Sequence, residues 1–385
     1  MSTQIEEILP KPKVRLKFID MARSVAILLM LEGHFVDDSL VLSARDPENP
    51  IYAIWHFIRS FTAPIFLTVT GIIFVYLLLQ KREESWIKNI RIKKGFKRVL
   101  ELFFWGYMVQ WYAFHVLECI AVGIFSILII YGIYKIIKVI PLWIYFFLAG
   151  VTLFVLYPFV QELPLQMSWA ENIWYSVLNI VNTECVPSIQ FPTVPFVAYT
   201  MFGAMIGALL HDFHSHVKKL YFPLIFTIVG AAFFFFSTNI LDFIQLVFTS
   251  LFDSYNYNLV ELNWQFQRIG MVIMELSVLM YIDNLWGHKI NGNNLFLKIG
   301  QNTLTVYILH MVLLYGSISG IGLGKTFHEA LSPWQVAFGA AGFVLFFVII
   351  IKYLESIKAA VSKALEWINI GFTFLIERLR SPLNK

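Results

Sequence analysis

The chain has 385 residues, of which 58% are hydrophobic and only 14% are charged, and its mean hydropathy is +0.69. Soluble domains carry about 25% charged residues, so this composition excludes an ordinary soluble domain and predicts an all-α, polytopic integral membrane protein. The net charge of +4 is too small to indicate a nucleic-acid partner.

Ten apolar stretches follow the basic tail of residues 1–16, and each approaches the roughly 20 residues that a membrane-spanning helix needs. Within a transmembrane domain of residues 17–352, we expect spans at residues 17–36, 57–80, 98–117, 119–137, 141–160, 193–210, 221–241, 265–286, 300–319 and 334–352. The first stretch contains charges and lacks a small-residue cleavage site, so we expect a retained span and no signal peptide. Residues 353–385 place apolar side chains at helical spacing among charged ones, which predicts an amphipathic helix on the inner membrane surface or a packing element between subunits.

Lysine and arginine residues concentrate in alternate loops between these stretches. The tail and residues 81–98 are strongly basic, whereas residues 37–48 and 162–184 carry mainly acidic side chains. Because positively charged loops stay on the cytoplasmic side, this alternation predicts ten spans with both termini in the cytoplasm.

Four ionisable side chains, Asp20, Arg23, Glu32 and His34, interrupt the first apolar stretch. Each would cost roughly 2.5–3.5 kcal/mol against lipid, so we expect them to face a protein interior or an aqueous cavity. Eleven helical steps bring His34 onto the same face as Arg23, about 16 Å further along the axis. Asp20 lies one turn before Arg23 and can pair with it. These residues form either one wall of an active site or a structural pair and an interior histidine that fix helix packing.

Further basic residues lie beside the second and third stretches. Lys94, Lys97 and Arg98 precede or begin the third stretch, where they suit the phosphates of a coenzyme. The alternative is that they serve orientation alone, because a cytoplasmic loop is basic in any case. His56 and Arg59 follow an outward loop, where they can contact a substrate or anchor the helix at the interface.

The later stretches also contain polar side chains on shared helical faces. Thr303, Tyr307 and His310 fall on one face of the ninth stretch, where they either complete a polar cavity or join helices by hydrogen bonds. Arg268 and Glu275 share a face of the eighth stretch and can pair there. The candidate partners of Glu32 are these two residues together with Glu101 and His115.

The sequence contains no motif typical of a metal site. Cys119 and Cys185 lack metal-ligand spacing and form either two separate thiols or one disulfide. His211, His214 and His216 lie in a cytoplasmic loop, and we expect them to be solvated. We therefore expect no metal cofactor.

Several short motifs follow one another in an order typical of one family of membrane enzymes. Ten residues separate Arg23 from His34, and this arrangement resembles the first span of the acyltransferase type 3 superfamily. The residues around it, with Asp20 three positions before Arg23, resemble more closely the bacterial relatives of heparan-alpha-glucosaminide N-acetyltransferase. Further similar motifs are Ala63-Pro64 with Gly71, Lys94-Gly95-Phe96-Lys97-Arg98, Pro192 and Pro195 with Gly203 and Gly207, and Gly300-Gln301-Asn302 with Tyr307 and His310. Ser24, Phe196 and Ser60 depart from the Gly, Trp and His usual in that family.

The resemblance covers most of the chain before residue 320 and implies an acyltransferase of a bacterial inner membrane. Such an enzyme moves an acyl group, usually acetyl, from cytoplasmic acyl-coenzyme A to a sugar amine or hydroxyl on or across the membrane. The donor would be acetyl-coenzyme A and the acceptor a sugar or glycan. The identity of the acceptor, N- or O-acylation and a possible homodimer stay open.

Motifs and resemblance together give the expected site residues. We expect catalytic roles for Asp20, Arg23, His34 and His310, coenzyme binding by Arg23, Lys94, Lys97 and Arg98, and acceptor binding by His56, Arg59, Asn302 and Tyr307. An imidazole with an ordinary pKa near 6.5 can act at neutral pH as a general base or as a carrier of the acyl group. His34 is therefore the predicted reactive residue, by direct transfer or through an acyl-histidine intermediate.

Two other classes of function use similar residues. Intramembrane Asp, Arg, Glu and His side chains also mark solute transporters, although the sequence contains no internal duplication of the kind many carriers have. A non-catalytic membrane scaffold or sensor with the same fold is the third class. Dependence on acyl-coenzyme A and on His34 distinguishes the enzyme from both.

Overall fold

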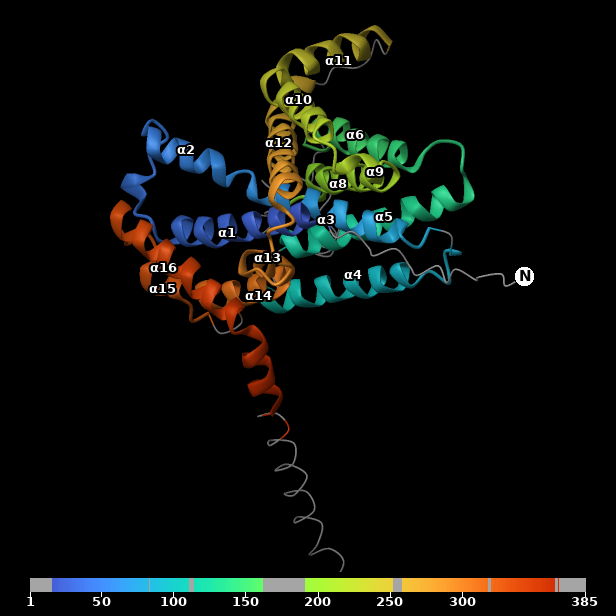
Figure 1. The fold of residues 1–385 in the computed structure, drawn as a ribbon. Helices are drawn as coiled ribbons and strands as arrows, with labels where there is room; N and C mark the ends of the chain where they lie inside the picture. The colour runs from blue at the N-terminus through green and yellow to red at the C-terminus, as the bar shows by residue number, and fades with distance from the viewer. Residues whose placement is uncertain are drawn as a thin grey trace, which may run out of the picture.

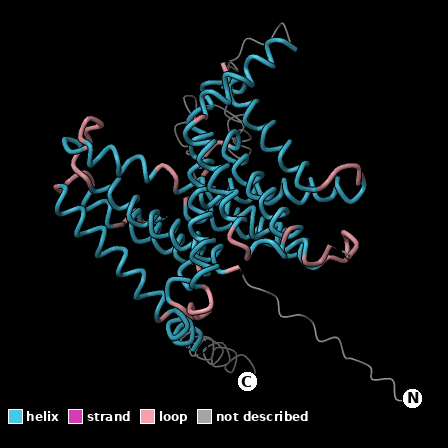
Figure 2. The backbone as a smooth tube through the Cα atoms, turned by 45° about the horizontal axis from the view of Figure 1, so that its top comes forward, coloured by secondary structure: helices cyan, strands magenta, loops and turns pink. Residues whose placement is uncertain are grey.

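The computed structural model describes residues 16–82, 84–110, 114–161, 191–251, 258–317, 320–363 and 366. In this part of the chain the regular elements are helices, and the only extended pairing is an isolated bridge between Leu40 and Leu331 (Figures 1 and 2). The helices are α1 (Lys17–Ser39), α2 (Pro50–Arg59), α3 (Thr62–Leu79), α4 (Ile90–Val109), α5 (Val116–Ile136), α6 (Leu142–Gln161), α8 (Thr193–Asp212), α9 (His214–Val217), α10 (Tyr221–Phe235), α11 (Ser237–Leu251), α12 (Asn263–Trp286), α13 (Leu295–Gln301), α14 (Thr303–Tyr315), α15 (Leu323–Phe327) and α16 (Pro333–Lys352). The all-α prediction is confirmed for these residues.

Each of the ten expected spans overlaps one or more of these helices, but fewer helices have both the length and the composition of a membrane span. Among the described residues, five helical segments qualify, namely those at 50–79, 116–136, 193–212, 259–286 and 333–352. A sixth qualifies if α10 and α11, which meet at a 75° bend, form one broken span. α1 and α4 carry too many charged side chains to qualify by composition. The count of ten spans and the cytoplasmic termini therefore stay predictions.

The core of the bundle is the contact between α3 and α8, with α6 on the far side of α8. Two glycines explain why α3 and α8 approach so closely. A Cβ at Gly203 would collide with the backbone of Thr68, and one at Gly207 would collide with the backbone of Ile72. Small residues spaced four apart let helix backbones meet inside a membrane, so this glycine pair brings α3 and α8 into contact.

α1 runs through the middle of the bundle and contacts α3, α12, α13 and α16. Ser24 lies at the contact with α13. Its hydroxyl donates to the carbonyl of Phe296 at 2.5 Å and accepts from the amide of Gly300 at 2.9 Å. These bonds hold α13 against the N-terminal half of α1.

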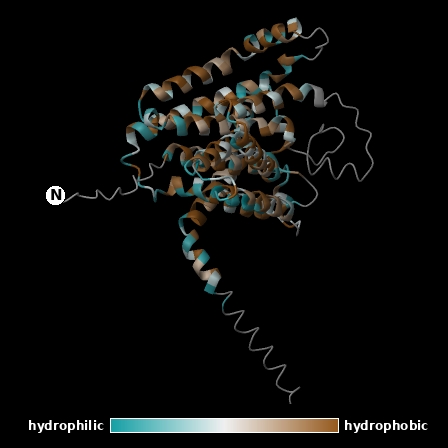
Figure 3. Cartoon of the chain, turned by 90° about the vertical axis from the view of Figure 1, so that its right-hand side faces the viewer, coloured by the Kyte–Doolittle hydropathy of each residue, from teal (hydrophilic) through white to brown (hydrophobic). Residues whose placement is uncertain are grey.

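Large apolar side chains remain exposed along the outer helices, and Figure 3 shows that hydrophobic residues predominate in many of the helices. Phe338 and Leu345 of α16 are 76% and 58% exposed, and Ile129 of α5 is 48% exposed. Such surfaces are stable against lipid and costly in water, so they agree with an integral membrane protein. Residues 354–363 continue as a helix that leaves the bundle (Figure 1). Most of the expected amphipathic segment lies outside the described residues, as do residues 1–15.

Candidate active site

Two cavities lie along one face of α1. We call the larger one the histidine cavity, because His34, His56 and His115 line it; its volume is about 1100 Å³. We call the smaller one the basic cavity, because Arg23, Arg91, Lys94 and Arg98 line it; its volume is about 270 Å³. Arg23 lines the basic cavity and His34 lines the histidine cavity, so one face of α1 forms part of the wall of both cavities.

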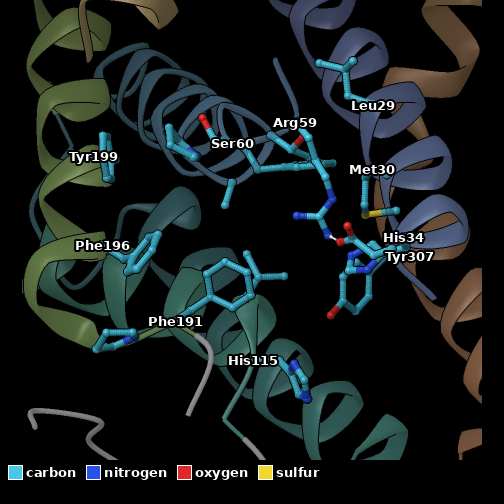
Figure 4. A pocket seen from close by; sticks show the side chains of 18 of the residues that line it. Leu29, Met30, His34, Arg59, Ser60, His115, Phe191, Phe196, Tyr199 and Tyr307 are labelled. Atoms are coloured by element: carbon cyan, nitrogen blue, oxygen red, sulfur yellow. Dashed lines mark ion pairs between the residues drawn. The ribbon is translucent and has the colours of Figure 1, made fainter. Parts of the chain in front are cut away.

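The histidine cavity has one polar and one aromatic side (Figure 4). α1 and α2 contribute His34 and Arg59 on one side, while Phe191, Phe196 and Tyr199 line the other side around α8. A cavity of this volume exceeds the roughly 300–1,000 Å³ of common ligand sites, so it can hold more than a single sugar ring.

His34 meets two side chains of α14. Its Nδ1 atom lies 3.1 Å from the hydroxyl of Tyr315, and its ring lies 5.3 Å from the ring of His310, measured between centroids. The hydrogen bond at Nδ1 leaves Nε2 as the ring nitrogen for proton or acyl transfer. His310 is fully buried, with Nδ1 3.3 Å from the Val306 carbonyl and with no hydrogen-bond partner for Nε2 among the described residues.

α2 is tied to α1 beside this histidine. Arg59 forms an ion pair with Asp37, drawn as a dashed line in Figure 4. Trp55 Nε1 donates to the carboxylate of Glu32 at 2.6 Å. Arg59 passes over Gly33, where an added Cβ would lie 3.0 Å from its Nε atom. The sequence-predicted residues His56 and Arg59 therefore both line the histidine cavity.

Two expectations about buried charges need correction. The hydrogen-bond partner of Glu32 is Trp55, and none of the four candidates Arg268, Glu275, Glu101 and His115 takes that place. The expected Arg268–Glu275 pair is also absent from the described residues; Arg268 instead lies over Trp264 and bonds the Ser60 carbonyl. Helical periodicity identifies a shared face, but it does not say which neighbouring helix supplies the contact.

The basic cavity is built mainly from α1, α3, α4, α5 and α14. Arg23 lies 3.8 Å from Asp20, as the spacing predicted, and its guanidinium donates to Thr303 at 2.9 Å. Arg91, Lys94 and Arg98 follow one another at three and four residues along α4, so they share one helical face toward the cavity. The volume is below that of common ligand sites, so the cavity can hold only part of a coenzyme.

Four predicted site residues, namely Asp20, Lys97, Asn302 and His310, lie outside the lining of both cavities. Lys97 is exposed and is not a lining residue of either cavity, although its neighbours Lys94 and Arg98 line the basic cavity. Asn302 lies between α13 and α14, where its side-chain amide donates to the Lys298 carbonyl at 2.8 Å. Asp20 is buried and contacts Arg23 without lining either cavity. The roles predicted for these residues stay predictions.

Four side chains line both cavities and therefore separate them by a single layer. These residues, which we call the partition, are Met30 of α1, Phe66 of α3, Val116 of α5 and Tyr307 of α14. Met30 lies between Arg23 and His34 on their shared face, at seven and four residues respectively. A group passing from one cavity to the other would have to move past this layer.

Three lining residues were missed as site residues. His115 caps the N-terminus of α5, Tyr315 ends α14 beside Gly316, and Arg268 lies on α12. Each reaches the histidine cavity from a helix far from α1 in sequence, and no local pattern signals that meeting. Arg91 had a signal, because its spacing to Lys94 and Arg98 repeats at helical period.

Candidates for a metal site or a disulfide are few in the described part of the chain. There, no three side chains of His, Cys, Asp or Glu are grouped in a way that could hold a metal ion. Cys119 is fully buried in α5, whereas Cys185 lies outside the described residues, so the question of a disulfide stays open.

A family model described as "Heparan-alpha-glucosaminide N-acetyltransferase, catalytic" matches residues 15–231, which is more than half of the chain. The matched region includes His34, Arg59 and the four basic residues of the basic cavity. α12 and α14, which contribute Arg268 and Tyr315, follow it. No curated protein matches the chain.

Proposed function

Since the chain belongs to the family of heparan-alpha-glucosaminide N-acetyltransferase catalytic domains, we propose that it transfers an acetyl group from acetyl-coenzyme A to a sugar amine or hydroxyl. In this proposal the donor binds at the basic cavity from the cytoplasm, and the acceptor occupies the histidine cavity on the opposite side. The protein would act in a bacterial inner membrane, as a relative of the acyltransferase type 3 enzymes.

The observation that carries the proposal is the pairing of two cavities across one layer of side chains. Four basic side chains line the smaller cavity and suit the phosphates of a coenzyme, because guanidinium and ammonium groups form strong hydrogen bonds to phosphate. The imidazole of His34 lines the other cavity. Along α1 the two sites lie about 16 Å apart, which an extended pantetheine arm would have to bridge past the partition.

His34 would perform the chemistry through Nε2. As a general base, it takes the proton of the acceptor amine or hydroxyl while that atom attacks the thioester carbonyl; the carbon–sulfur bond breaks, and the proton then neutralises the departing thiolate. As a carrier, Nε2 itself attacks the carbonyl, and the carbon–sulfur bond breaks to release the thiolate. The acceptor then attacks the acetyl-imidazolium, the carbon–nitrogen bond breaks, and the acceptor's proton passes to the thiolate or to water. In either route Tyr315, at 3.1 Å from Nδ1, holds the ring orientation and supports the positive charge that develops on it.

Arg23 would position the donor from the same helix. Its guanidinium is already held by Asp20 and Thr303, so its direction toward the basic cavity is preset. Lys94 is exposed and Arg98 is partly exposed, and both would meet the phosphates at the mouth of the basic cavity. This division predicts that Arg23 affects the rate and that the α4 residues affect mainly donor affinity.

The test is incubation of the purified chain with isotope-labelled acetyl-coenzyme A and a panel of amino sugars, followed by mass spectrometry of the product and of the intact protein. We expect a labelled sugar with the wild type and none with His34→Ala. His288→Gln is the matched control, because His288 is an exposed histidine outside both cavities. Label on the wild-type protein that is missing from His34→Ala would identify the acyl-histidine route.

A solute carrier is the competing function, because it too would need ionisable side chains around an intramembrane cavity. Protein in liposomes that moves a solute but neither binds nor consumes acetyl-coenzyme A would support the carrier and refute the enzyme. Full activity of His34→Ala in the transfer assay would refute the proposed role of that imidazole.

A further inference from the structure

Arg268 of α12 is a lining residue of the histidine cavity with no acidic partner in the described part of the chain. Its guanidinium carbon lies 3.8 Å from the ring centroid of Trp264, and its Nε donates to the carbonyl of Ser60 at 3.2 Å. Both contacts hold the side chain in place without neutralising it. Arg59, the other arginine of this cavity, is neutralised by Asp37.

The cavity therefore has an unbalanced charge at one end. Its described lining contains two guanidinium groups and one carboxylate, that of Asp37, which is already paired with Arg59. A guanidinium held at membrane depth without a counter-charge is costly, and such groups usually serve a ligand or a partner. The remaining positive charge is the one on Arg268.

Polar groups beside Arg268 suit a sugar. Gln265, one helical turn earlier on α12, lines the same cavity, and its buried Oε1 has no hydrogen-bond partner among the described residues. Tyr199 of α8 donates to the backbone carbonyl of Gln265 at 3.5 Å and also lines the cavity. A buried amide oxygen without a partner costs free energy until a ligand hydroxyl donates to it.

This group lies apart from the reactive imidazole. Arg268 contacts Ser60 and Trp264, whereas His34 contacts Tyr315 and His310. Figure 4 shows Tyr199 across the cavity from His34, with Ser60 between Tyr199 and Arg59. The large volume of the cavity leaves room for a ligand that touches both ends.

We propose that Arg268 binds an oxyanion carried by the acceptor, a phosphate or a carboxylate, that Gln265 Oε1 beside it accepts from a sugar hydroxyl, and that the acceptor's amine or hydroxyl lies at His34. That the ligand is the acceptor rests on the proposed acetyl transfer. The preference of the cavity for an anion does not depend on that proposal. Arg268 and Gln265 lie beyond residues 15–231, so these two side chains belong to the part of this chain that the family model does not cover, whereas the neighbouring Tyr199 lies within it. Arginine is suited to this role because its planar fork binds phosphate and carboxylate with two parallel hydrogen bonds.

The experiment measures binding of small ligands to the full chain in detergent micelles by calorimetric titration. The ligands are glucosamine, glucosamine 6-phosphate, glucuronic acid and inorganic phosphate. We expect the wild type to bind an anionic sugar roughly tenfold or more tightly than glucosamine, because a charge-assisted pair is gained. The phosphate and carboxylate sugars identify which oxyanion is preferred, and inorganic phosphate alone should bind more weakly than glucosamine 6-phosphate.

Three variants make the test specific. Arg268→Gln should abolish the preference for the anionic sugar, so that the ratio of the two affinities falls to about one. Arg268→Lys should retain part of the preference, because the positive charge remains while the two parallel hydrogen bonds of the guanidinium are lost. Arg45→Gln is the control, since Arg45 pairs with Glu329 outside the cavity and should leave the preference unchanged. Equal affinity of the wild type for glucosamine and for the anionic sugars, or a preference that survives in folded Arg268→Gln, would overturn the proposal.

The binding result and the transfer result are separable. Transfer to neutral sugars with no anion preference in the binding assay would refute the subsite and leave the proposed function intact. An anion preference that depends on Arg268, in a protein that transfers no acetyl group, would support the subsite and refute the proposed function.

Discussion

Replacing Tyr315 with phenylalanine should slow acetyl transfer without weakening donor binding. The substitution removes only the hydroxyl that lies 3.1 Å from Nδ1 of His34 and leaves the ring that packs edge-on against the imidazole. When His34 takes a proton or an acyl group it becomes positively charged, and a hydrogen bond to a charged group contributes about 1.5–3 kcal/mol. At about 1.4 kcal/mol per factor of ten, the full loss corresponds to roughly a ten- to hundredfold lower rate.

The exposure of Tyr315 sets where in that range the effect should fall. Its side chain is 38% exposed, so water can replace part of the lost hydrogen bond, and we expect a fall in kcat of about tenfold. Steady-state kinetics with labelled acetyl-coenzyme A should show this fall at nearly constant donor KM. Tyr145→Phe is the matched control, because it also loses one hydrogen bond, at 2.6 Å to the Ile137 carbonyl, but lies outside both cavities. An unchanged kcat for Tyr315→Phe, or an equal fall in the control, would refute this orientation role.

Three further predictions follow from the cavities and the helix packing. Arg98→Gln should raise the KM for acetyl-coenzyme A about tenfold, because a charged hydrogen bond to phosphate is lost. Lys97→Gln is the control and should leave this KM unchanged, because Lys97 does not line the basic cavity. Equal effects of the two substitutions on KM would contradict the assignment of Arg98 to donor binding. Val116→Phe enlarges a partition residue and should lower transfer by up to about a hundredfold while coenzyme binding, measured by titration, persists. Gly203→Ala should destabilise the protein by about 1–3 kcal/mol because its Cβ meets the α3 backbone, and Gly342→Ala, which faces open space on α16, should not lower the melting temperature; similar melting temperatures for the two variants would refute the close contact.

Much of the fold and part of the site could be predicted from the sequence, because both depend on local periodicity. The apolar stretches predicted helices at the right places, and the three-residue spacing of Asp20 and Arg23 predicted their contact. The eleven-residue spacing of Arg23 and His34 predicted one helical face, and each residue does line a cavity along it. Whether each helix spans the membrane depends on more than periodicity, since α1 and α4 combine the length of a span with several charges.

Contacts between distant helices could not be predicted in the same way. Glu32 bonds Trp55 of α2, and His34 bonds Tyr315 of α14, because loops and helix packing bring those helices beside α1. Arg268 shared a helical face with Glu275, yet it contacts Trp264 and Ser60. A helical wheel gives the direction of a side chain, whereas its partner depends on which helix packs there.

In the proposed mechanism an acetyl group passes between two cavities on opposite sides of the partition. Its most direct test uses sealed proteoliposomes with labelled acetyl-coenzyme A only outside and the acceptor sugar only inside. We predict labelled acetyl sugar in the lumen with the wild type and none with His34→Ala. Product that forms only when donor and acceptor are on the same side, in vesicles proven to be sealed, would contradict the account.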